Sequence, residues 1–212
     1  MIKLYHCAGA RSARSLWLLN ELGLEYELVE LEFTMASLRT PEYLAISPLG
    51  RVPCLVDGDL TLFESGAICQ YLCENYGDGS LYRERGHPER NQWLQWLHYA
   101  ETIAVHAASL VQQQVFIAPE KRSDVVVKLE SRRLQKSLEV LDQHLVGRDY
   151  LLDGGFSAAD TALAYSVHLG RQFVDIAGMG DLKAYYQRCA ARPAFQRSIR
   201  VVASCSAIAE RA

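Results

Sequence analysis

The spacing of apolar residues changes near residue 80, and the part before that point alternates strands with helices. Ile2 to His6 and Tyr26 to Leu31 have the length and alternation of strands, and Ser12 to Gly23 is a leucine-rich helix that ends at a glycine. A strand, a helix and a strand within about thirty residues form a crossover unit. We therefore expect the two strands to be parallel and the crossover to be right-handed.

A hairpin and a further helix complete this first part. Two apolar runs, Val52 to Val56 and Leu60 to Phe63, flank the turn Asp57-Gly58-Asp59, and an Asp-Gly turn between apolar runs is typical of a β-hairpin. Apolar residues then recur at helical spacing from Ser65 to Tyr76. Residues 34–48 contain two prolines and are expected to be irregular or loosely helical.

The rest of the chain shows helical periodicity only. One apolar stripe from Trp93 to Val111 and another from Leu134 to Leu145 predict two long helices. Ser157 and Asp160 have the spacing of a capping box, which predicts the start of a third helix. Two shorter helices are expected after residue 180.

The change of period also predicts the domain limits. Residues 1–76 form an α/β domain, residues 77–86 have the composition of a linker, and residues 87–212 form an all-helical domain. No internal repeat or low-complexity segment is visible. The expected fold class is therefore an α/β domain followed by an all-α domain.

Composition and charge narrow the function classes. Twenty-two basic and 25 acidic residues leave a net charge of −3, which is neither the footprint of a nucleic-acid binder nor a polybasic surface for membranes. No apolar stretch approaches the roughly 18 residues of a membrane span, and the first residues lack the apolar core of a signal peptide. We expect a cytoplasmic protein. The six cysteines have no paired zinc spacing, so buried structural thiols and no metal site are expected.

Three motifs together resemble the cytosolic glutathione S-transferases. They are Ser47-Pro48-Leu49-Gly50-Arg51-Val52-Pro53, Glu64-Ser65-Gly66-Ala67-Ile68 and Phe156-Ser157-Ala158-Ala159-Asp160. The resemblance covers nearly the whole chain, and Leu16 to Leu24 is similar to the first-helix segment of bacterial members, with both theta-like and beta-like features. It implies a thioredoxin-like N-terminal domain, an all-α C-terminal domain and glutathione as co-substrate.

The same resemblance implies a homodimer, because family members pack the first long helix of the second domain across a two-fold axis. Small side chains allow helices to approach closely, and this helix carries such a stripe at Ala100, Ala104, Ala107 and Ala108. The alternative is that the alanines pack within one chain.

The resemblance places the γ-glutamyl end of glutathione at Glu64 and Ser65. A carboxylate beside a helix start can bind the ammonium group. Hydroxyl and backbone N–H groups at the same place can bind the carboxylate, which the positive end of the helix dipole favours. The alternative is that Ser65 only caps the helix and Glu64 lies in solvent.

The remainder of glutathione is expected to lie along Val52 and Pro53. In the family the corresponding X-Pro bond is cis, and the valine backbone pairs with the cysteinyl backbone of glutathione as a short antiparallel strand does. Arg51 can pair with the glycine carboxylate, as can Arg39. Both arginines can equally be solvated, and for Arg39 a solvated side chain is the preferred interpretation.

The residue that activates the thiol is where the sequence departs from the family. A thiol with a pKa near 8.5 is only about 3% thiolate at pH 7, and family members stabilise the thiolate with a Tyr, Ser or Cys near the first helix. Alignment on Arg14 places Ala10 at the theta-like serine and Arg11 at the beta-class cysteine. Ser12 is the nearest hydroxyl, although it can also be a helix cap. Tyr5 is the second catalytic candidate, and Arg11 can add positive potential.

Cys7 and the histidines receive structural interpretations. Cys7 precedes the expected catalytic position by several residues. His106 lies near the position of the beta-class active-site histidine but one residue out of register, so whether it faces the cleft stays open. His98 and His168 lie on predicted helices and are expected to be packed or at the surface.

Three functions are compatible with these residues. The favoured function is a transferase that conjugates the glutathione thiolate to small hydrophobic electrophiles, as in detoxification, with the acceptor pocket in the helical domain. A glutathione-dependent thiol–disulfide or peroxide reductase normally needs a cysteine at the Arg11 position. A member that only binds glutathione or hydrophobic ligands keeps the fold without the activity.

Overall fold

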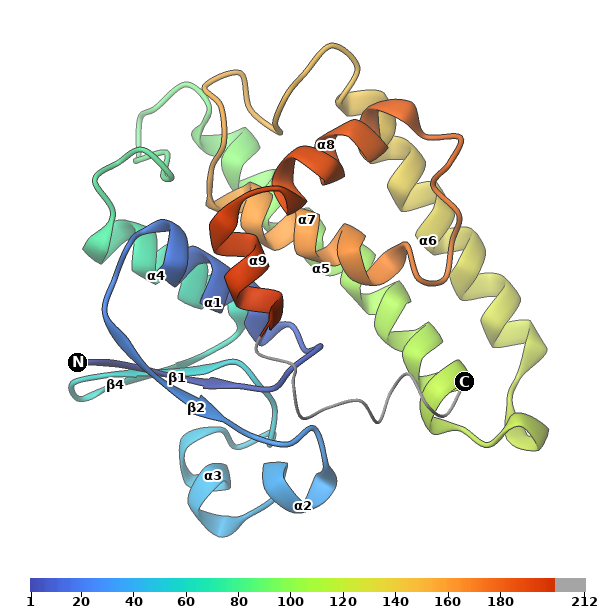
Figure 1. Ribbon diagram of the computed structural model, residues 1–212, viewed down its shortest axis with the longest axis horizontal. Coiled ribbons are helices and arrows are strands. Elements are labelled where there is room, and N and C mark those ends of the chain that lie inside the picture. The colour runs from blue at the N-terminus through green and yellow to red at the C-terminus, as the bar shows by residue number, and fades with distance from the viewer. Residues whose placement is uncertain (201–212) are drawn as a thin grey trace. The chain divides into compact units, whose positions relative to one another are not determined.

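A four-stranded sheet with the order β2-β1-β3-β4 is the centre of the N-terminal part of the computed structural model, which describes residues 1–200 (Figure 1). Strands β1 (Ile2–His6) and β2 (Tyr26–Glu30) are parallel, whereas β3 (Cys54–Asp57) is antiparallel to both β1 and β4 (Leu60–Phe63). Helix α1 (Ser12–Glu21) joins the parallel pair, which confirms the predicted crossover unit. The predicted hairpin is also present.

Helices cover both faces of this sheet (Figure 1). Helices α1 and α4 (Ser65–Tyr76) contact each other on one face. The other face carries two short helices, α2 (Met35–Leu38) and α3 (Pro41–Ile46), in the segment expected to be irregular or loosely helical. Both begin at a threonine whose side chain accepts a backbone N–H bond, Thr34 for α2 and Thr40 for α3.

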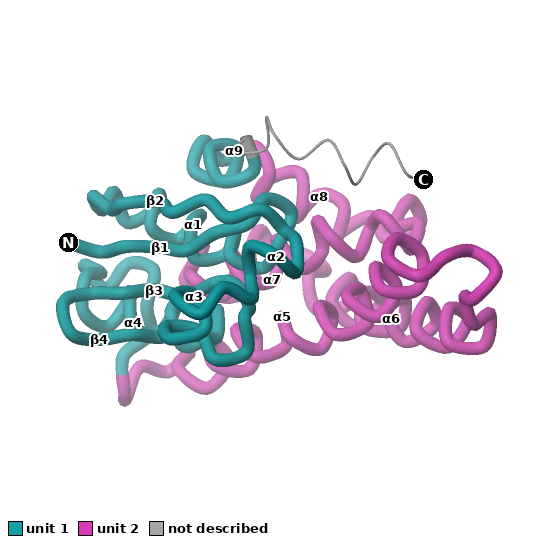
Figure 2. The backbone as a smooth tube through the Cα atoms, turned by 90° about the horizontal axis from the view of Figure 1, so that it is seen from below, with its two compact units in different colours: residues 1–84, 192–205 teal, residues 85–191, 206–212 magenta. Residues whose placement is uncertain are grey.

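The helix α9 (Pro193–Arg200) belongs to the same compact unit as the sheet (Figure 2). It packs against α1, and the ring centroids of Phe195 and Trp17 lie 4.8 Å apart. Arg192, directly before α9, forms an ion pair with Glu21 on α1. The first unit therefore consists of Met1–Glu84 and this last helix, which the sequence analysis had grouped with the helical domain.

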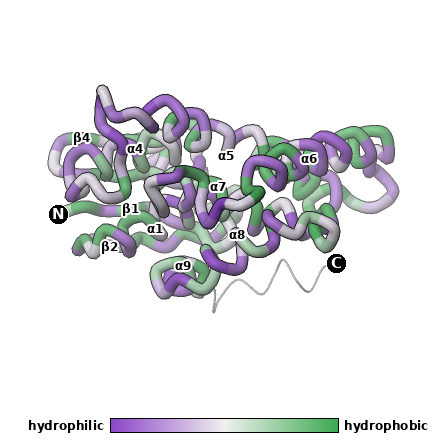
Figure 3. Tube along the Cα trace, turned by 90° about the horizontal axis from the view of Figure 1, so that it is seen from above, coloured by the Kyte–Doolittle hydropathy of each residue, from purple (hydrophilic) through white to green (hydrophobic). Residues whose placement is uncertain are grey.

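The second unit, Arg85–Ala191, is helical. Its elements are α5 (Arg90–Val111), a π-helical turn (Gln112–Phe116), a 3-10 turn (Pro119–Lys121), α6 (Asp124–His144), α7 (Ala158–Gly170) and α8 (Gly180–Ala190). Hydrophobic and hydrophilic residues alternate along α6, as an amphipathic helix requires (Figure 3). Within residues 1–200, no helix combines the length and the apolar content needed to cross a membrane.

The alanine stripe of α5 is buried inside this second unit. Ala100, Ala104 and Ala107 are at most 2% exposed, and α5 packs against α7. At this contact the hydroxyl of Ser166 donates a hydrogen bond to the carbonyl of Ala100 at 3.1 Å. Three of the four alanines therefore pack within the chain instead of offering a dimer surface, and the homodimer stays a prediction.

Candidate functional site

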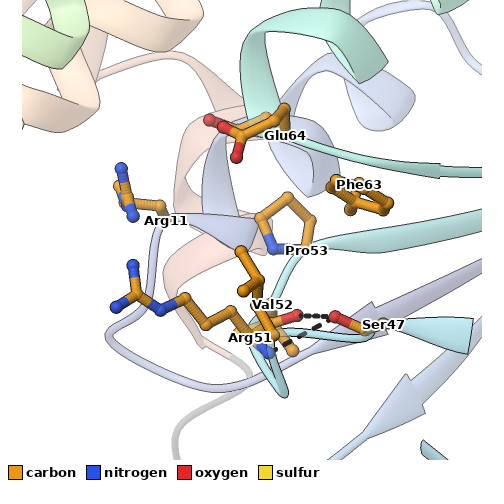
Figure 4. A pocket seen from close by; sticks show the side chains of 9 residues that line it. Arg11, Ser47, Arg51, Val52, Pro53, Phe63 and Glu64 are labelled. Atoms are coloured by element: carbon orange, nitrogen blue, oxygen red, sulfur yellow. Dashed lines mark hydrogen bonds between the residues drawn. The ribbon is translucent and has the colours of Figure 1, made fainter. Parts of the chain in front are cut away.

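A pocket in the first unit lies where the loop before β3, the start of α4 and the turn after β1 meet (Figure 4). Its walls are Arg11, Ser47, Leu49, Arg51, Val52, Pro53, Phe63, Glu64 and Ser65. All the predicted site residues line it except Ser12 and Tyr5. The pocket is thus formed by residues of the first two of the three sequence motifs, by Phe63 directly before the second motif and by Arg11 directly before α1.

The loop before β3 is fixed by hydroxyl groups and by one glycine. The Arg51 carbonyl accepts hydrogen bonds from the Tyr43 hydroxyl and the Ser47 hydroxyl, both at 2.8 Å. Gly50 has φ +58°, and a Cβ there would lie 2.3 Å from the carbonyl oxygen of Leu38, so only glycine fits. This support holds the Val52–Pro53 peptide, which is cis as the resemblance implied.

The turn from β4 into α4 presents a carboxylate and a helix start to the pocket. Glu64 has φ +79° and is exposed, whereas Ser65 is 3% exposed. The buried guanidinium of Arg14 donates a hydrogen bond to the Ser65 hydroxyl at 3.0 Å. This bond places a positive charge behind the helix start, where the first N–H groups of α4 already favour an anion.

The turn after β1 places Arg11 and Ser12 differently. Arg11 occupies the position before the first residue of α1 and lines the pocket. Ser12 is fully buried, and its hydroxyl bonds to His6 Nδ1 at 2.8 Å and to the Cys7 backbone N–H at 3.2 Å. The Ser12 hydroxyl therefore lies in the protein interior instead of in the pocket wall.

Tyr5 lies on the α3 side of the sheet. Its ring centroid is 5.5 Å from that of Tyr43, and it packs against a buried cluster that includes Cys7, Val52 and Cys54. Burial raises the pKa of the Cys54 thiol to about 11, so this thiol is un-ionised at neutral pH. Tyr5 supports the loop that carries Val52 but does not line the pocket.

The charged groups of the pocket gather on one side of the Val52–Pro53 peptide. Figure 4 shows the guanidinium groups of Arg11 and Arg51 and the carboxylate of Glu64 there. Two cations and one anion in reach of a helix start suit a small zwitterionic ligand with additional negative charge.

Both halves of the chain match known family models. Residues 1–74 match the glutathione S-transferase N-terminal domain, and residues 102–193 match the C-terminal domain. Glutathione S-transferase 3 of Zea mays is 32% identical over 195 residues, which cover 87% of this chain and 86% of the relative. The chain belongs to the glutathione S-transferase family. The pocket lies wholly within the first of the two family domains.

Solved glutathione S-transferase structures share the fold. A glutathione transferase from Pseudomonas putida, with one glutathione disulfide bound per subunit, is 26% identical with a TM-score of 0.83 over 94% of this chain and 91% of that one. A family member from Pseudomonas fluorescens pf-5, with two glutathione bound, is 27% identical with a TM-score of 0.83 over 93% and 92% of the two chains. The expected glutathione S-transferase fold is confirmed.

The histidines and cysteines considered in the sequence analysis lie outside the pocket in the described part of the chain. In the helical unit, His106 Nδ1 lies 2.7 Å from a carboxylate oxygen of Glu130, and His168 Nδ1 lies 2.7 Å from the Tyr186 hydroxyl. His98 is exposed. The cysteines within residues 1–200 are buried, and no group of three His, Cys, Asp or Glu side chains there can hold a metal. Cys205 is outside the described residues.

Sequence reasoning missed three residues that shape the glutathione S-transferase pocket. Arg14 served only as an alignment anchor, although an arginine within the leucine-rich face of α1 signals a buried cation. Phe63 lines the pocket and is 46% exposed, and its place directly before the Glu64-Ser65 motif was a usable signal. The support from the Tyr43 hydroxyl has no sequence signal, because it depends on how α3 packs.

Proposed function

We propose that this glutathione S-transferase holds glutathione in the pocket of its first unit and joins the thiolate to small hydrophobic electrophiles, as in detoxification. The grouping of Arg11, Arg51 and Glu64 beside the Val52–Pro53 peptide carries the proposal. Glutathione has one ammonium, two carboxylates and a thiol that reacts as an anion. Two guanidinium groups, one carboxylate and a helix start complement that set of charges.

Each part of glutathione has a partner in this assignment. Glu64 binds the ammonium, and the Ser65 hydroxyl and the first N–H groups of α4 bind the γ-glutamyl carboxylate, with Arg14 behind them. The Val52 backbone pairs with the cysteinyl residue, and Arg51 binds the glycine carboxylate. Pro53 shapes the wall between these subsites.

For thiolate stabilisation we assign Arg11, because the Ala13 and Arg14 N–H groups at the start of α1 already donate hydrogen bonds to carbonyls of the preceding turn. Of the three candidates from the sequence, Arg11 is the one that lines the pocket, whereas the Ser12 hydroxyl is buried and hydrogen-bonded and Tyr5 packs on Tyr43. The cationic side chain favours the anionic form of a nearby thiol. Ser12 then acts on the shape of the turn, and not on sulfur.

The test of conjugation is turnover with 1-chloro-2,4-dinitrobenzene, in which the thiolate forms a C–S bond and chloride leaves with the electron pair of the broken C–Cl bond. At saturating glutathione, the pH profile of kcat/KM for the electrophile reports the pKa of the bound thiol, because the enzyme that meets the electrophile is then the glutathione complex. We expect Arg11→Ala to raise that pKa by about one unit. No turnover by a folded wild-type protein that binds glutathione would favour a binding protein without activity.

The glutathione assignment is tested separately by calorimetry. Glu64→Gln keeps the shape of the side chain and removes its charge, and we expect it to weaken glutathione binding by about 2 kcal/mol, because the ligand ammonium loses its partner. Glu42→Gln is the control with the same change of charge, since Glu42 is exposed on α3 and does not line the pocket. Equal losses in both variants would contradict the site.

A reductase is the second candidate, because the Pseudomonas putida structure holds glutathione disulfide. No cysteine is among the residues that line the pocket in the described part of the chain, which disfavours a mixed disulfide on the protein. Hydroxyethyl disulfide as substrate separates the two activities. Turnover that exceeds the rate of conjugation would favour the reductase.

Assembly and location follow from family membership as further proposals. We propose a cytoplasmic homodimer that binds neither nucleic acid nor membrane. Light scattering at micromolar concentration is expected to give about twice the chain mass of 23.8 kDa. A mass equal to that of one chain would show a monomer.

A further inference from the structure

A buried polar network lies beneath the turn that carries Arg11. His6, at the end of β1, is 1% exposed, and its Nδ1 lies 2.8 Å from the Ser12 hydroxyl oxygen. The same oxygen accepts a hydrogen bond from the Cys7 N–H at 3.2 Å and donates one to the Cys7 carbonyl at 3.3 Å. His6 Nε2 is also buried and makes no hydrogen bond with any residue from 1 to 200.

These contacts favour the tautomer of His6 that carries the proton on Nδ1. A hydroxyl has one donor and two acceptor sites. If Nδ1–H donates to Ser12, the hydroxyl accepts from His6 and Cys7 and donates to the Cys7 carbonyl, so that all three sites are used. In either tautomer Nε2 is buried without a partner among residues 1–200, and a buried unpaired N–H donor is less common in proteins than a buried unpaired acceptor, which favours the proton on Nδ1. Burial also lowers the pKa of His6 to about 4, so the ring is neutral at pH 7.

The network closes the turn between β1 and α1. Both backbone groups of Cys7 are bonded to the Ser12 side chain, and the Cys7 carbonyl also accepts the Ala10 N–H at 3.2 Å. Gly9 has φ +73°, which lets the chain reverse within this short loop. Arg11 lies inside the closed turn and directly before α1, so the network supports the backbone from which Arg11 reaches the pocket.

We propose that His6 is a positioning residue for thiolate formation: its Nδ1–H orients the Ser12 hydroxyl, which holds the Cys7–Arg11 turn and with it Arg11. The inference rests on the proposed role of Arg11. His6 does not line the pocket, so it acts through the turn and not on glutathione.

Two nearly isosteric variants test this role. In His6→Asn the side-chain amide can place an N–H where Nδ1–H lies, whereas His6→Leu has a similar shape and no donor. We expect His6→Leu to raise the thiol pKa from the pH profile of kcat/KM by at least about half a unit, with little change in the KM for glutathione. His6→Asn is expected to restore the wild-type profile. A merely structural role would make both variants less stable without moving the pKa.

The path through Arg11 is tested with a double variant and a control. If His6 acts through Arg11, His6→Leu adds no further pKa shift in an Arg11→Ala background. His168→Leu is the matched control, since this histidine is also hydrogen-bonded through Nδ1 to a hydroxyl, but lies in the second unit. It is expected to lower the melting temperature and leave the thiol pKa unchanged.

Other outcomes identify which idea fails. If Arg11→Ala raises the thiol pKa but neither His6 variant does, the proposed function stands and the role of His6 is wrong. If Arg11→Ala has no effect, the assignment of Arg11 itself is wrong.

The tautomer of His6 can be measured independently of activity. Long-range ¹⁵N–¹H correlation of the full-length protein is expected to show the proton of His6 on Nδ1, and a proton on Nε2 would overturn the inference. If His6→Leu does not fold, His6→Asn and the tautomer still decide it.

Discussion

At the scale of single residues, Glu64 combines a binding role with an unfavourable backbone. Its φ of +79° is adopted reluctantly by a residue with a Cβ, and such positions cost of order 1–3 kcal/mol. The side chain lines the pocket and is exposed, so its own burial does not account for this geometry. The turn aims the carboxylate at the place assigned to the ligand ammonium, so stability is exchanged for binding at this one position.

The variant with glycine at position 64 is therefore expected to be more stable than the variant with alanine. Both Glu64→Gly and Glu64→Ala remove the carboxylate, but only glycine removes the Cβ that is strained at positive φ. Relief of this backbone strain, worth about 1–3 kcal/mol, outweighs the free-energy cost of the conformational entropy that glycine loses on folding, about 0.5–1 kcal/mol. In urea unfolding, the unfolding free energy of Glu64→Gly is expected to be about 1 kcal/mol higher than that of Glu64→Ala. Both variants are expected to bind glutathione poorly.

The control lies one turn further along. Ala67 is exposed on α4 and has ordinary helical geometry, so Ala67→Gly is expected to lower stability by about 0.5–1 kcal/mol. Relative to alanine at the same position, glycine should thus raise the unfolding free energy at position 64 and lower it at position 67. Equal midpoints for Glu64→Gly and Glu64→Ala would show that the backbone at this residue stores no strain.

At the scale of elements, the start of α7 depends on a buried carboxylate. Asp160 accepts the Ser157 N–H at 2.7 Å, the Ser157 hydroxyl at 3.1 Å and the Leu151 N–H at 3.1 Å. The capping box predicted from the Ser157 and Asp160 spacing is confirmed. Burial is complete, and it raises the pKa of Asp160 to about 6 in spite of these donors.

This raised pKa predicts how stability depends on pH. An unfolded Asp has a pKa of about 3.9, so between about pH 4 and pH 6 the folded state keeps a proton that the unfolded state has lost. The unfolding free energy therefore falls as the pH rises through this window, by up to about 2–3 kcal/mol. Asp160→Asn removes the titration and is less stable at every pH, because its amide N–H faces other donors.

Urea unfolding of wild type and Asp160→Asn between about pH 4 and pH 7 measures this effect. The stability difference between the two proteins is expected to shrink as the pH rises to about 6 and then to remain constant. A difference that does not change with pH would mean that the carboxylate is ionised throughout.

The elements that could be predicted are those whose signal is local. The strands β1 and β2, the Asp-Gly hairpin and the capping box of α7 depend on alternation, turn chemistry and spacing, and the structure has all of them. The helices α2 and α3 are only one or two turns long, too short for a periodic signal, although their threonine caps were visible.

The residues of the candidate site also divide into those with a local sequence signal and those without one. The residues of the Val52–Pro53 and Glu64–Ser65 motifs lie in the pocket because neighbouring residues fix each turn. The inward direction of the Ser12 hydroxyl has a different origin, since it depends on the partner His6 at the end of β1 and on Gly9 at positive φ. No spacing rule contains that information.

At the scale of the whole molecule, the last described helix completes the first unit. Arg192 donates two hydrogen bonds to the carboxylate of Glu21, at 2.6 and 2.8 Å, and Trp17 Nε1 donates a third at 2.8 Å. Phe195 packs edge-on against Trp17, and both rings are at most 1% exposed. The connection is distant in sequence, so no local pattern predicts it.

Loss of this ion pair is expected to weaken the fold more than loss of a surface pair. Arg192→Met leaves the Glu21 carboxylate, whose side chain is 10% exposed, without its cation, and is expected to cost about 2 kcal/mol. Lys136→Met, which breaks an exposed pair with Glu139, is expected to cost at most about 1 kcal/mol. Urea unfolding compares the two variants, and equal losses would mean that the Arg192 pair behaves as a surface contact.

The return of α9 to α1 also has a consequence for synthesis. Translation proceeds at about 5–20 residues per second, so a ribosome that has finished Glu84 needs roughly 5–20 s more to supply the segment up to Arg192. During that interval the nascent N-terminal half lacks Phe195, and the face of Trp17 that Phe195 covers stays open to chaperones or to other chains. A premature stop codon anywhere in the helical unit therefore also leaves the glutathione-binding half unfinished.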